Sequence, residues 1–224
     1  MYFAKYGIIF HLLKESDLEM VRQWRNAPHI VEHMEYREHI TPEMQKKWFE
    51  SINNVHHLYC VVEYNHEKIG LTNAKNLDFD SWTGEAGIFL YDKKYYRTPV
   101  TAIMAILGGE IFFHLLNWKA GFAHVLKENR VQKVFMQMLG YRICPGQEDK
   151  INQKFVITRE SYHRKRGVLL KLLSVVVNTK EKGKLVIEPG ELNDERIRFW
   201  EEKMLKGNPD LVVEDTPEGR IYYY

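Results

Sequence analysis

Apolar runs of strand length recur along the first 160 residues of the chain. They occupy residues 7–13, 56–64, 68–77, 83–91, 120–126 and 154–160. The polar residues 65–67 separate the second run from the third, which predicts a β-hairpin at this point. Stretches with helical spacing lie between the other runs. Strands that alternate with helices predict an α/β fold, with helices on both faces of a mixed sheet.

Four helices are predicted from start signals that precede apolar residues at helical spacing. The expected N-caps and first residues are Ser16 or Asp17, Thr41 with Pro42, Thr98 with Pro99, and Asn129. The third helix extends to about Leu116, and Gly140 ends the fourth. The apolar positions that define the four helices are Leu18, Val21 and Trp24; Met44, Trp48 and Phe49; Val100, Ile103, Met104, Leu107, Ile111 and Leu115; and Val131, Val134, Phe135 and Met138.

The remaining residues form a shorter and less regular series. Residues 164–177 fit a helix or a strand that joins the core, and an apolar run follows at residues 185–189. A capped helix is expected from about Asn193 to Leu205, and residues 211–224 are typical of a hairpin that turns at residues 217–219. On one face of that helix lie the apolar residues Ile197, Trp200 and Met204.

This pattern predicts a domain of residues 1–163 and a C-terminal α+β extension of residues 164–224. An extension of this size has little core of its own, so its apolar face must dock elsewhere. Two arrangements stay open at this stage. The face docks on the first domain, or it binds a protein partner or a second copy of the chain.

Composition narrows the class of protein. The 224 residues carry a formal net charge of +2, so electrostatics do not predict a nucleic-acid partner. Cys60 and Cys144 lack a CxxC spacing and fit reduced thiols. The N-terminal apolar run is broken by Lys5 and His11, and the run around Lys171 is too short for a bilayer. We therefore expect a soluble, cytoplasmic protein without a membrane segment.

Five segments together resemble a known family. They are VRQWRNAPHIVEHM, ITPEMQKKWF, EKIGLTNAKNLD, GEAGIFLYDKKYYR and KENRVQKVFMQMLGYR, which lie within about residues 10–160. In this combination they resemble the GNAT acetyltransferases, in particular the branch with RimJ-like and RimL-like enzymes. The resemblance implies a splayed mixed sheet and an N-acetyltransferase that uses acetyl-CoA, with a small-molecule or peptide amine as acceptor.

The resemblance also implies positions for acetyl-CoA. Its pantetheine is expected against the backbone of Ile88, Phe89 and Leu90, between two parted strands. Its diphosphate is expected on the loop that begins at Arg97. Further cofactor contacts are expected from Thr98, Thr101, Ala102 and Asn129.

The diphosphate loop departs from the family pattern because YYRTPVTA contains no glycine. Pro99 supplies no N–H group, and the β-branched Val100 disfavours a positive φ. The loss of one or two charge-assisted hydrogen bonds, about 1.5–3 kcal/mol each, weakens binding roughly ten- to ten-thousand-fold. Arg97 can pair directly with a phosphate, and Thr98 still caps the helix. The loop is thus either rebuilt or retired.

Candidate proton-transfer groups lie on the strands that flank the expected acceptor pocket. Glu85 and His124 are the candidate bases, since acyl transfer requires a neutral amine. Many relatives carry a tyrosine as proton donor on the helix after the asparagine, but Met136 occupies the matching position here. On the acceptor side, the resemblance points to Arg25 and Asn26 as substrate-binding residues.

A second motif suggests a different chemistry. His29, Glu32 and His33 match the HxxEH pattern of inverted zinc peptidases. The segment is short, no third ligand helix is visible, and the same residues fit the resemblance, so no metal is expected. Two functions stay open: an acetyl-CoA-dependent N-acetyltransferase acting on an aminosugar, a small metabolite or a protein terminus, and an inactive GNAT-fold scaffold that binds other molecules.

Overall fold

The computed structural model describes residues 1–96 and 98–224, and its strands form one eleven-stranded sheet. The strand order across the sheet is β10-β11-β9-β1-β2-β3-β4-β5-β6-β8-β7. Among the described strands, all pairs are antiparallel except β5 with β6, so the sheet is mixed, as predicted. The strands are β1 (Tyr2–Lys5), β2 (Ile8–Leu12), β3 (Leu58–Tyr64), β4 (Glu67–Asp78), β5 (Thr83–Leu90), β6 (Ala120–Leu126), β7 (Arg142–Ile143), β8 (Asn152–Thr158), β9 (Lys184–Ile187), β10 (Val212–Thr216) and β11 (Gly219–Tyr223).

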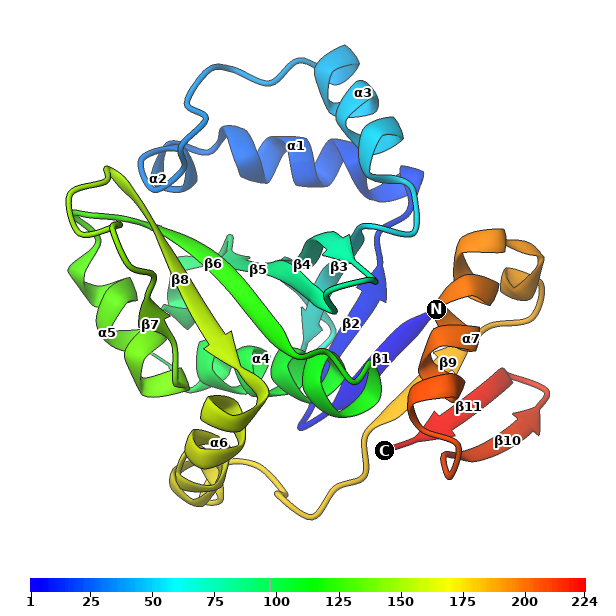
Figure 1. Cartoon of the computed structure of the whole chain (residues 1–224). Helices are drawn as coiled ribbons and strands as arrows, with labels where there is room; N and C mark the ends of the chain where they lie inside the picture. The colour runs from blue at the N-terminus through cyan, green and yellow to red at the C-terminus, as the bar shows by residue number, and fades with distance from the viewer. Residues whose placement is uncertain (97) are drawn as a thin grey trace.

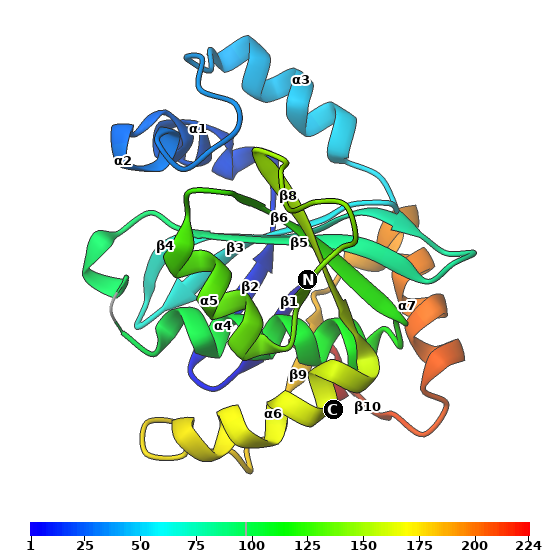
Figure 2. The same cartoon turned by 60° about the vertical axis from the view of Figure 1, so that its left-hand side comes forward.

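Helices cover both faces of this sheet (Figure 1). α1, α2 and α3 lie on one face, and α4 and α6 lie on the other, which Figure 2 shows from a second side. The α-helices are α1 (Leu18–Asn26), α2 (Pro28–Val31), α3 (Pro42–Ile52), α4 (Val100–Gly109), α5 (Arg130–Leu139), α6 (Arg159–Leu173) and α7 (Glu195–Gly207). The shorter helical turns are η1 (Glu15–Asp17), η2 (Lys93–Tyr95), η3 (Glu110–Leu115) and η4 (Glu191–Asn193).

The first two strands, β1 and β2, form a hairpin. The sequence pattern does not predict β1 as a strand separate from β2. The residues between them, Tyr6 and Gly7, have φ angles of 59° and 75°, and this turn pairs β1 with β2. The predicted hairpin of β3 and β4 is confirmed, with Asn65 and His66 also at positive φ. Asparagine adopts this conformation readily, whereas tyrosine seldom does. The first turn therefore escapes a composition-based prediction.

Three clusters of buried side chains hold the layers together. One cluster joins α1 to the sheet through Val21, Trp24, Val61 and Leu71. The largest joins α4, η3, α6 and α7 to the opposite face, and the fully buried Trp118 belongs to it. The third cluster places α5 against β6 and β8 through Ala123, Val125, Met136 and Phe155.

Some predicted helical faces differ from the observed ones. The predicted third helix is continuous but changes to a π-helical turn at Glu110. Met44 is exposed rather than directed to the core. In α5 the buried residues are Met136 and Leu139, whereas the predicted positions Val131, Val134 and Met138 are exposed. The reason is that only one side of α5 packs on the sheet. The apolar residues of the sequence do not show which side this is.

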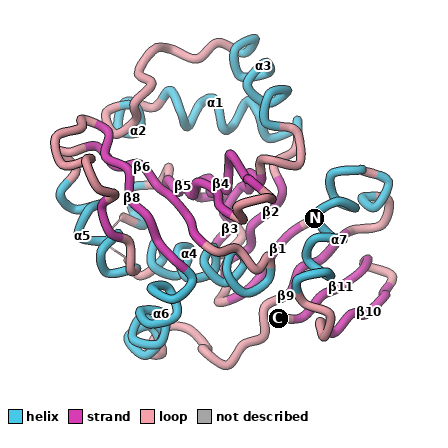
Figure 3. Tube along the Cα trace, viewed as in Figure 1, coloured by secondary structure: helices cyan, strands magenta, loops and turns pink. Residues whose placement is uncertain are grey.

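The C-terminal residues continue the same sheet. β9 pairs with β1 and also with β11, and Figure 3 shows α7 with β9, β10 and β11 beside the N-terminal strand. The side chains of Ile197, Trp200 and Met204 are buried in the largest cluster. α6 spans the expected boundary between residues 163 and 164, so the division into two domains stays a proposal.

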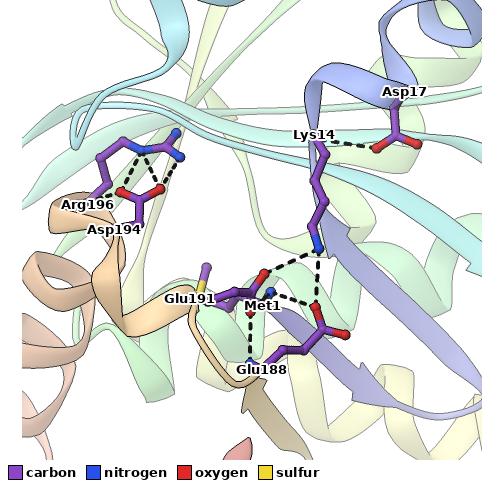
Figure 4. A network of polar contacts seen from close by, with 7 residues as sticks. All are labelled: Met1, Lys14, Asp17, Glu188, Glu191, Asp194 and Arg196. Atoms are coloured by element: carbon purple, nitrogen blue, oxygen red, sulfur yellow. Dashed lines mark hydrogen bonds and ion pairs between the residues drawn. The ribbon is translucent and has the colours of Figure 1, made fainter.

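A polar network reinforces this junction (Figure 4). Lys14 Nζ lies 3.2 Å from a carboxylate oxygen of Glu188 and 3.4 Å from one of Glu191. The amino group of Met1 also contacts Glu191, and Asp194 pairs with Arg196 at the start of α7. The network thus links Met1, which precedes β1, and the segment after β2 with the turn that follows β9.

A second polar cluster is buried beneath the sheet. Glu110 is 1% exposed, and Lys5 Nζ lies 2.7 Å from its Oε2. Tyr6 donates a hydrogen bond of 2.9 Å to Oε1, and Arg166 Nε donates another of 2.9 Å to the same oxygen. Burial favours the neutral acid, but Lys5 and Arg166 outweigh it and hold the pKa of Glu110 below its ordinary value. One carboxylate thus connects β1, η3 and α6.

Candidate functional site

The only parallel pair among the described strands is also where the sheet opens. β5 pairs with β6 at three positions, Thr83 with Ala120, Gly84 with Gly121, and Glu85 with Phe122. β5 then continues to Leu90 in register with β4, while β6 continues to Leu126 in register with β8. Beyond Glu85, residues 86–90 thus have an edge that faces away from β4 and is not paired with β6 in the described chain. The splayed sheet is therefore present.

Backbone alternation identifies which groups point to this parted edge. Tyr91 N donates to Ile69 O across β4, so odd-numbered residues of β5 direct their backbone groups to β4. Ile88 and Leu90 accordingly direct theirs to the parted edge. The Leu90 carbonyl already accepts a hydrogen bond of 3.2 Å from the Tyr96 hydroxyl. Of these two expected pantetheine contacts, Ile88 therefore has the more accessible backbone groups.

Gly87 leaves room on the α1 side of the parted edge. A Cβ atom at this position would lie 2.8 Å from Asn73 Nδ2, so a side chain cannot be added without moving Asn73. Asn73 is the register partner of both Gly87 and Tyr59. Its Oδ1 atom is buried and has no hydrogen-bond partner within the described residues. This oxygen is an acceptor that a bound N–H group can satisfy.

The structure brings the two predicted bases together. His124 Nδ1 lies 3.6 Å from Glu85 Oε2, and Lys75 Nζ lies 3.4 Å from the same oxygen. Burial favours the protonated acid, but the charge of Lys75, a hydrogen bond with Asn76 and the charge of His124 together outweigh it and hold the pKa of Glu85 below its ordinary value. Glu85 is therefore ionised near neutral pH and can orient an imidazole or an ammonium group.

The expected diphosphate loop is tightened by its own side chains. Thr98 Oγ1 donates to Tyr95 O at 2.8 Å and accepts from Val100 N at 3.3 Å. α4 is regular from Val100, and Pro99 already has helical angles, so it occupies the first turn as predicted, while Thr98 caps the turn through the bond from Val100 N. Val100 is helical and only 3% exposed, so its side chain packs in the core. The expected contact Arg97 lies outside the described residues.

The remaining loop positions lie on the first turn of α4. Thr101 and Ala102 are partly buried, and Ile103 N donates a hydrogen bond of 3.0 Å to Pro99 O. The first amides of a helix have no intrahelical partner, and the helix dipole favours an anion there. The turn therefore retains two features that suit a diphosphate, although the loop before it has lost its glycines.

Asn129 acts as a helix cap in the structure. Its Oδ1 accepts a hydrogen bond of 3.0 Å from Gln132 N at the start of α5. Its amide nitrogen is not used in this cap, so a contact of that nitrogen with a cofactor stays a prediction. Met136 is buried at the position where relatives carry a tyrosine. Burial raises the pKa of the nearby Tyr141, which disfavours it as a proton donor at neutral pH.

Arg25 and Asn26 lie at the end of α1 but behave differently. The Arg25 guanidinium lies 4.9 Å from the centre of the Trp48 ring and 3.4 Å from Gln45 Oε1. Asn26 binds both backbone groups of Ile40, at 2.9 Å and 2.8 Å. Asn26 therefore fixes the segment that precedes α3. Arg25 has the side chain that remains available to a ligand.

The residues of the HxxEH pattern do not converge. His29 Nε2 lies 2.8 Å from the Tyr91 carbonyl, while His33 Nε2 lies 3.4 Å from Glu32. Within residues 1–96 and 98–224, no group of three or more His, Cys, Asp or Glu side chains is arranged to hold a metal ion.

In the same ranges, none of the helices has both the length and the apolar character needed to cross a membrane.

Three site residues were not predicted from the sequence: Gln45, Tyr59 and Asn73. They come from α3, β3 and β4 and meet on the face of the sheet that α1 covers. Their proximity depends on strand register and helix docking. No local motif marks them.

Comparison with known proteins agrees with this geometry. No curated protein matches the chain. A spermidine N-acetyltransferase from Vibrio cholerae, solved with CoA and spermine, is similar in structure with a TM-score of 0.63 and 15% identity, over 71% of this chain and 99% of the other. FdhC, a nucleotide-linked sugar GNAT, has a TM-score of 0.62 and 17% identity, over 77% of this chain and 96% of FdhC. The aminoglycoside acetyltransferase AAC(6')-Ib, solved with coenzyme A, has a TM-score of 0.61 and 17% identity, over 71% and 99%.

These likenesses show the fold, and the family is shown by a separate match. The family model described as "Acetyltransferase (GNAT) domain" matches residues 10–165, which is more than half of the chain. The matched residues include the fork of β5 and β6, Glu85, His124 and Asn129. This chain belongs to the acetyltransferase (GNAT) domain family.

Proposed function

We propose that the protein is an acetyl-CoA-dependent N-acetyltransferase that acts on a primary amine, and that it belongs to the RimJ-like and RimL-like branch. The observation that carries the proposal is the parting of β5 and β6 directly after Glu85, with His124 on the facing strand. Family membership supports it. The structural neighbours also support it, since they include a spermidine N-acetyltransferase and an aminoglycoside acetyltransferase.

In this proposal acetyl-CoA lies along the parted edge. The pantetheine pairs with the backbone near Ile88, and Phe89 and Leu90 line its path. The diphosphate lies at the start of α4, where Thr98, Thr101 and Ala102 form a degenerate version of the family's loop. Arg97 replaces part of the lost backbone contacts through its charge, and Asn129 contributes from the start of α5.

The proposed reaction is direct acyl transfer. The amine nitrogen forms a bond to the acetyl carbon while the carbon–sulfur bond breaks, and coenzyme A leaves as a thiolate that solvent protonates. The ammonium form of the acceptor must first lose a proton. Imidazole suits proton transfer near neutral pH, so His124 takes this proton and Glu85 orients the ring and the amine.

The acceptor is proposed to be an aminosugar, a small metabolite or a protein N-terminus. It binds between the sheet and α1, where Arg25 lies, while Asn26 shapes the wall through Ile40. We also propose a cytoplasmic location, and a partner or second copy at the C-terminal extension.

Calorimetric titration with acetyl-CoA is the primary test. Micromolar binding, together with acetylation of at least one amine, is the expected result. The altered loop is the feature that favours the inactive scaffold, and absence of binding would support that alternative. Arg97→Ala should weaken binding at least tenfold, because it removes a charge-assisted contact with phosphate. An unchanged dissociation constant would remove Arg97 from the proposed site.

A further inference from the structure

Arg25 is a partly buried cation without a carboxylate partner in the described chain. Its guanidinium donates a hydrogen bond of 3.4 Å to Gln45 Oε1 and lies over the Trp48 ring, 4.9 Å from the ring centre. The ionisable side chains that act on it are the phenols of Tyr59 and Tyr36, and burial lowers its pKa. A buried cation is costly unless an anion compensates it. The chain itself therefore leaves a charge that a ligand can neutralise.

Gln45 adds an independent observation beside Arg25. Its side chain is 1% exposed, and its Nε2 atom has no hydrogen-bond partner within residues 1–96 and 98–224. Unpaired buried donors are rare in folded proteins because each loses the hydrogen bonds that it makes in water. Gln45 Nε2 thus lacks an acceptor, and the adjacent Arg25 guanidinium lacks an anion in the described chain. A bound acceptor can satisfy Gln45, and the guanidinium selects a negatively charged one.

Tyr59 connects this place with the proposed reaction centre. Its ring meets Trp48 edge to face with 5.1 Å between centroids, and Asn73 is its register partner on β4. Burial raises the pKa of the Tyr59 hydroxyl. The charge of Arg25 lowers this pKa, and the charge of Glu85 raises it, so both charged groups act on the hydroxyl. Tyr59 therefore lies within electrostatic reach of the cation on α1 and of the carboxylate on β5.

We propose that the acceptor amine carries an anionic group, a carboxylate or a phosphate, which binds Arg25 and Gln45 while the amine lies toward Glu85 and His124. This inference rests on the proposed function and specifies its substrate class. The polarity of the site matches such a molecule, with donors at one end and Asn73 Oδ1 and Glu85 at the other. A polyamine such as spermidine would place a second cation near Arg25 and is disfavoured by repulsion.

The test compares amines that differ in one anionic group. Glucosamine 6-phosphate is paired with glucosamine, and lysine is paired with lysinamide, while spermidine serves as the polycation. We expect kcat/KM to be at least tenfold higher for the anionic member of one pair, and the pair that responds identifies phosphate or carboxylate. Calorimetry with the same compounds measures binding independently of turnover.

Variants then assign the effect to Arg25. Arg25→Ala should raise KM for the anionic amine about ten- to a hundredfold and change kcat little, because a charged hydrogen bond in binding is lost. Arg25→Lys should recover part of the loss. Lys47→Ala is the matched control, since it removes an exposed charge from α3 and should leave KM unchanged. Equal thermal melting of all three variants shows that folding is intact.

The outcomes separate this inference from the proposed function. If amines are acetylated but neither pair shows a preference, or Arg25→Ala leaves KM unchanged, the anion site is refuted while the acetyltransferase stands. If no amine is acetylated, calorimetry decides. Binding of the anionic amines that disappears in Arg25→Ala supports the site, and absence of such binding overturns it. Failure of acetyl-CoA to bind refutes only the proposed function.

Discussion

The carboxylate of Glu85 and the imidazole of His124 lie 3.6 Å apart, on the two strands that form the parallel pair of the described sheet. Glu85 is the last residue of β5 that pairs with β6, and His124 lies two residues beyond its partner Phe122. Beyond them β5 presents a free edge. A proton acceptor and an orienting carboxylate thus lie where an acyl group on the parted edge would meet an amine from the α1 side.

The first prediction concerns this pair. Glu85→Gln and His124→Ala should each lower kcat/KM by about 10²–10⁴, the usual contribution of general acid–base catalysis, and leave the dissociation constant of acetyl-CoA unchanged. Steady-state kinetics and calorimetry measure the two quantities. Lys75→Met is an informative companion, because Lys75 holds the pKa of Glu85 low. Without Lys75 the pKa of Glu85 rises. The acidic limb of the pH profile of kcat/KM should therefore shift to higher pH in this variant. An unshifted acidic limb would show that protonation of Glu85 does not limit activity at acidic pH.

The second prediction separates two changes in the diphosphate loop. Val100 is buried in the largest cluster, so Val100→Gly should lower the free energy of unfolding by about 2–4 kcal/mol and leave acetyl-CoA binding no tighter. Pro99→Gly adds a backbone donor at a cost of about 0.4–1 kcal/mol and should tighten binding up to tenfold. Urea unfolding and calorimetry distinguish the two. Tighter binding by Val100→Gly alone would show that Val100 blocks the site.

The third prediction divides the roles of Asn129. Asn129→Ala removes the cap on Gln132 N and should lower the free energy of unfolding by about 0.5–2 kcal/mol. Asn129→Ser keeps a capping oxygen and removes only the amide nitrogen. A contact between that nitrogen and the cofactor therefore predicts weaker acetyl-CoA binding in both variants. Wild-type affinity in Asn129→Ser would leave Asn129 with a structural role only.

Much of the fold could be predicted because its signals are local. The hairpin at Asn65 and His66 has a turn residue suited to positive φ, and Thr41 does cap α3 by accepting from Met44 N. The turn at Tyr6 has no such signal. The exposed Val131 of α5 shows a different limit, since apolar spacing marks a helix but not the side that touches the sheet.

The candidate site divides in the same way. The proximity of Glu85 and His124 could be predicted because they lie on adjacent predicted strands, and their roles stay a prediction. Gln45, Tyr59 and Asn73 were missed because α3, β3 and β4 bring them together only through register and layer packing. Asn26 was expected to bind substrate; its amide binds both backbone groups of Ile40, and a contact with substrate stays a prediction. The sequence places Asn26 near the site, but its hydrogen-bond partners become clear only from the structure.

The fourth prediction concerns the buried carboxylate of Glu110. Glu110→Gln leaves Lys5 and Arg166 without their anion and should lower the free energy of unfolding by about 3–5 kcal/mol at pH 7. The pKa of Glu110 is held below its ordinary 4.5 in the folded protein. Its contribution is therefore complete above pH 4.5 and is lost as pH falls through the depressed value. Urea titrations from pH 3 to 7 should show a steeper acid loss in the wild type than in Glu110→Gln.

The last prediction concerns the C-terminal extension. Removal of residues 180–224 deletes β9, which pairs with β1, and uncovers the partners of Trp200 and Met204 in the largest cluster. The shortened protein should melt at a much lower temperature or become insoluble, because a large apolar surface becomes exposed. In the full chain, Trp200→Ala should cost about 3–5 kcal/mol, whereas Leu205→Ala on the more exposed side of α7 should change stability by less than about 1 kcal/mol. A truncated protein that keeps its melting temperature but loses self-association or a bound partner would instead show that the extension serves as an interface.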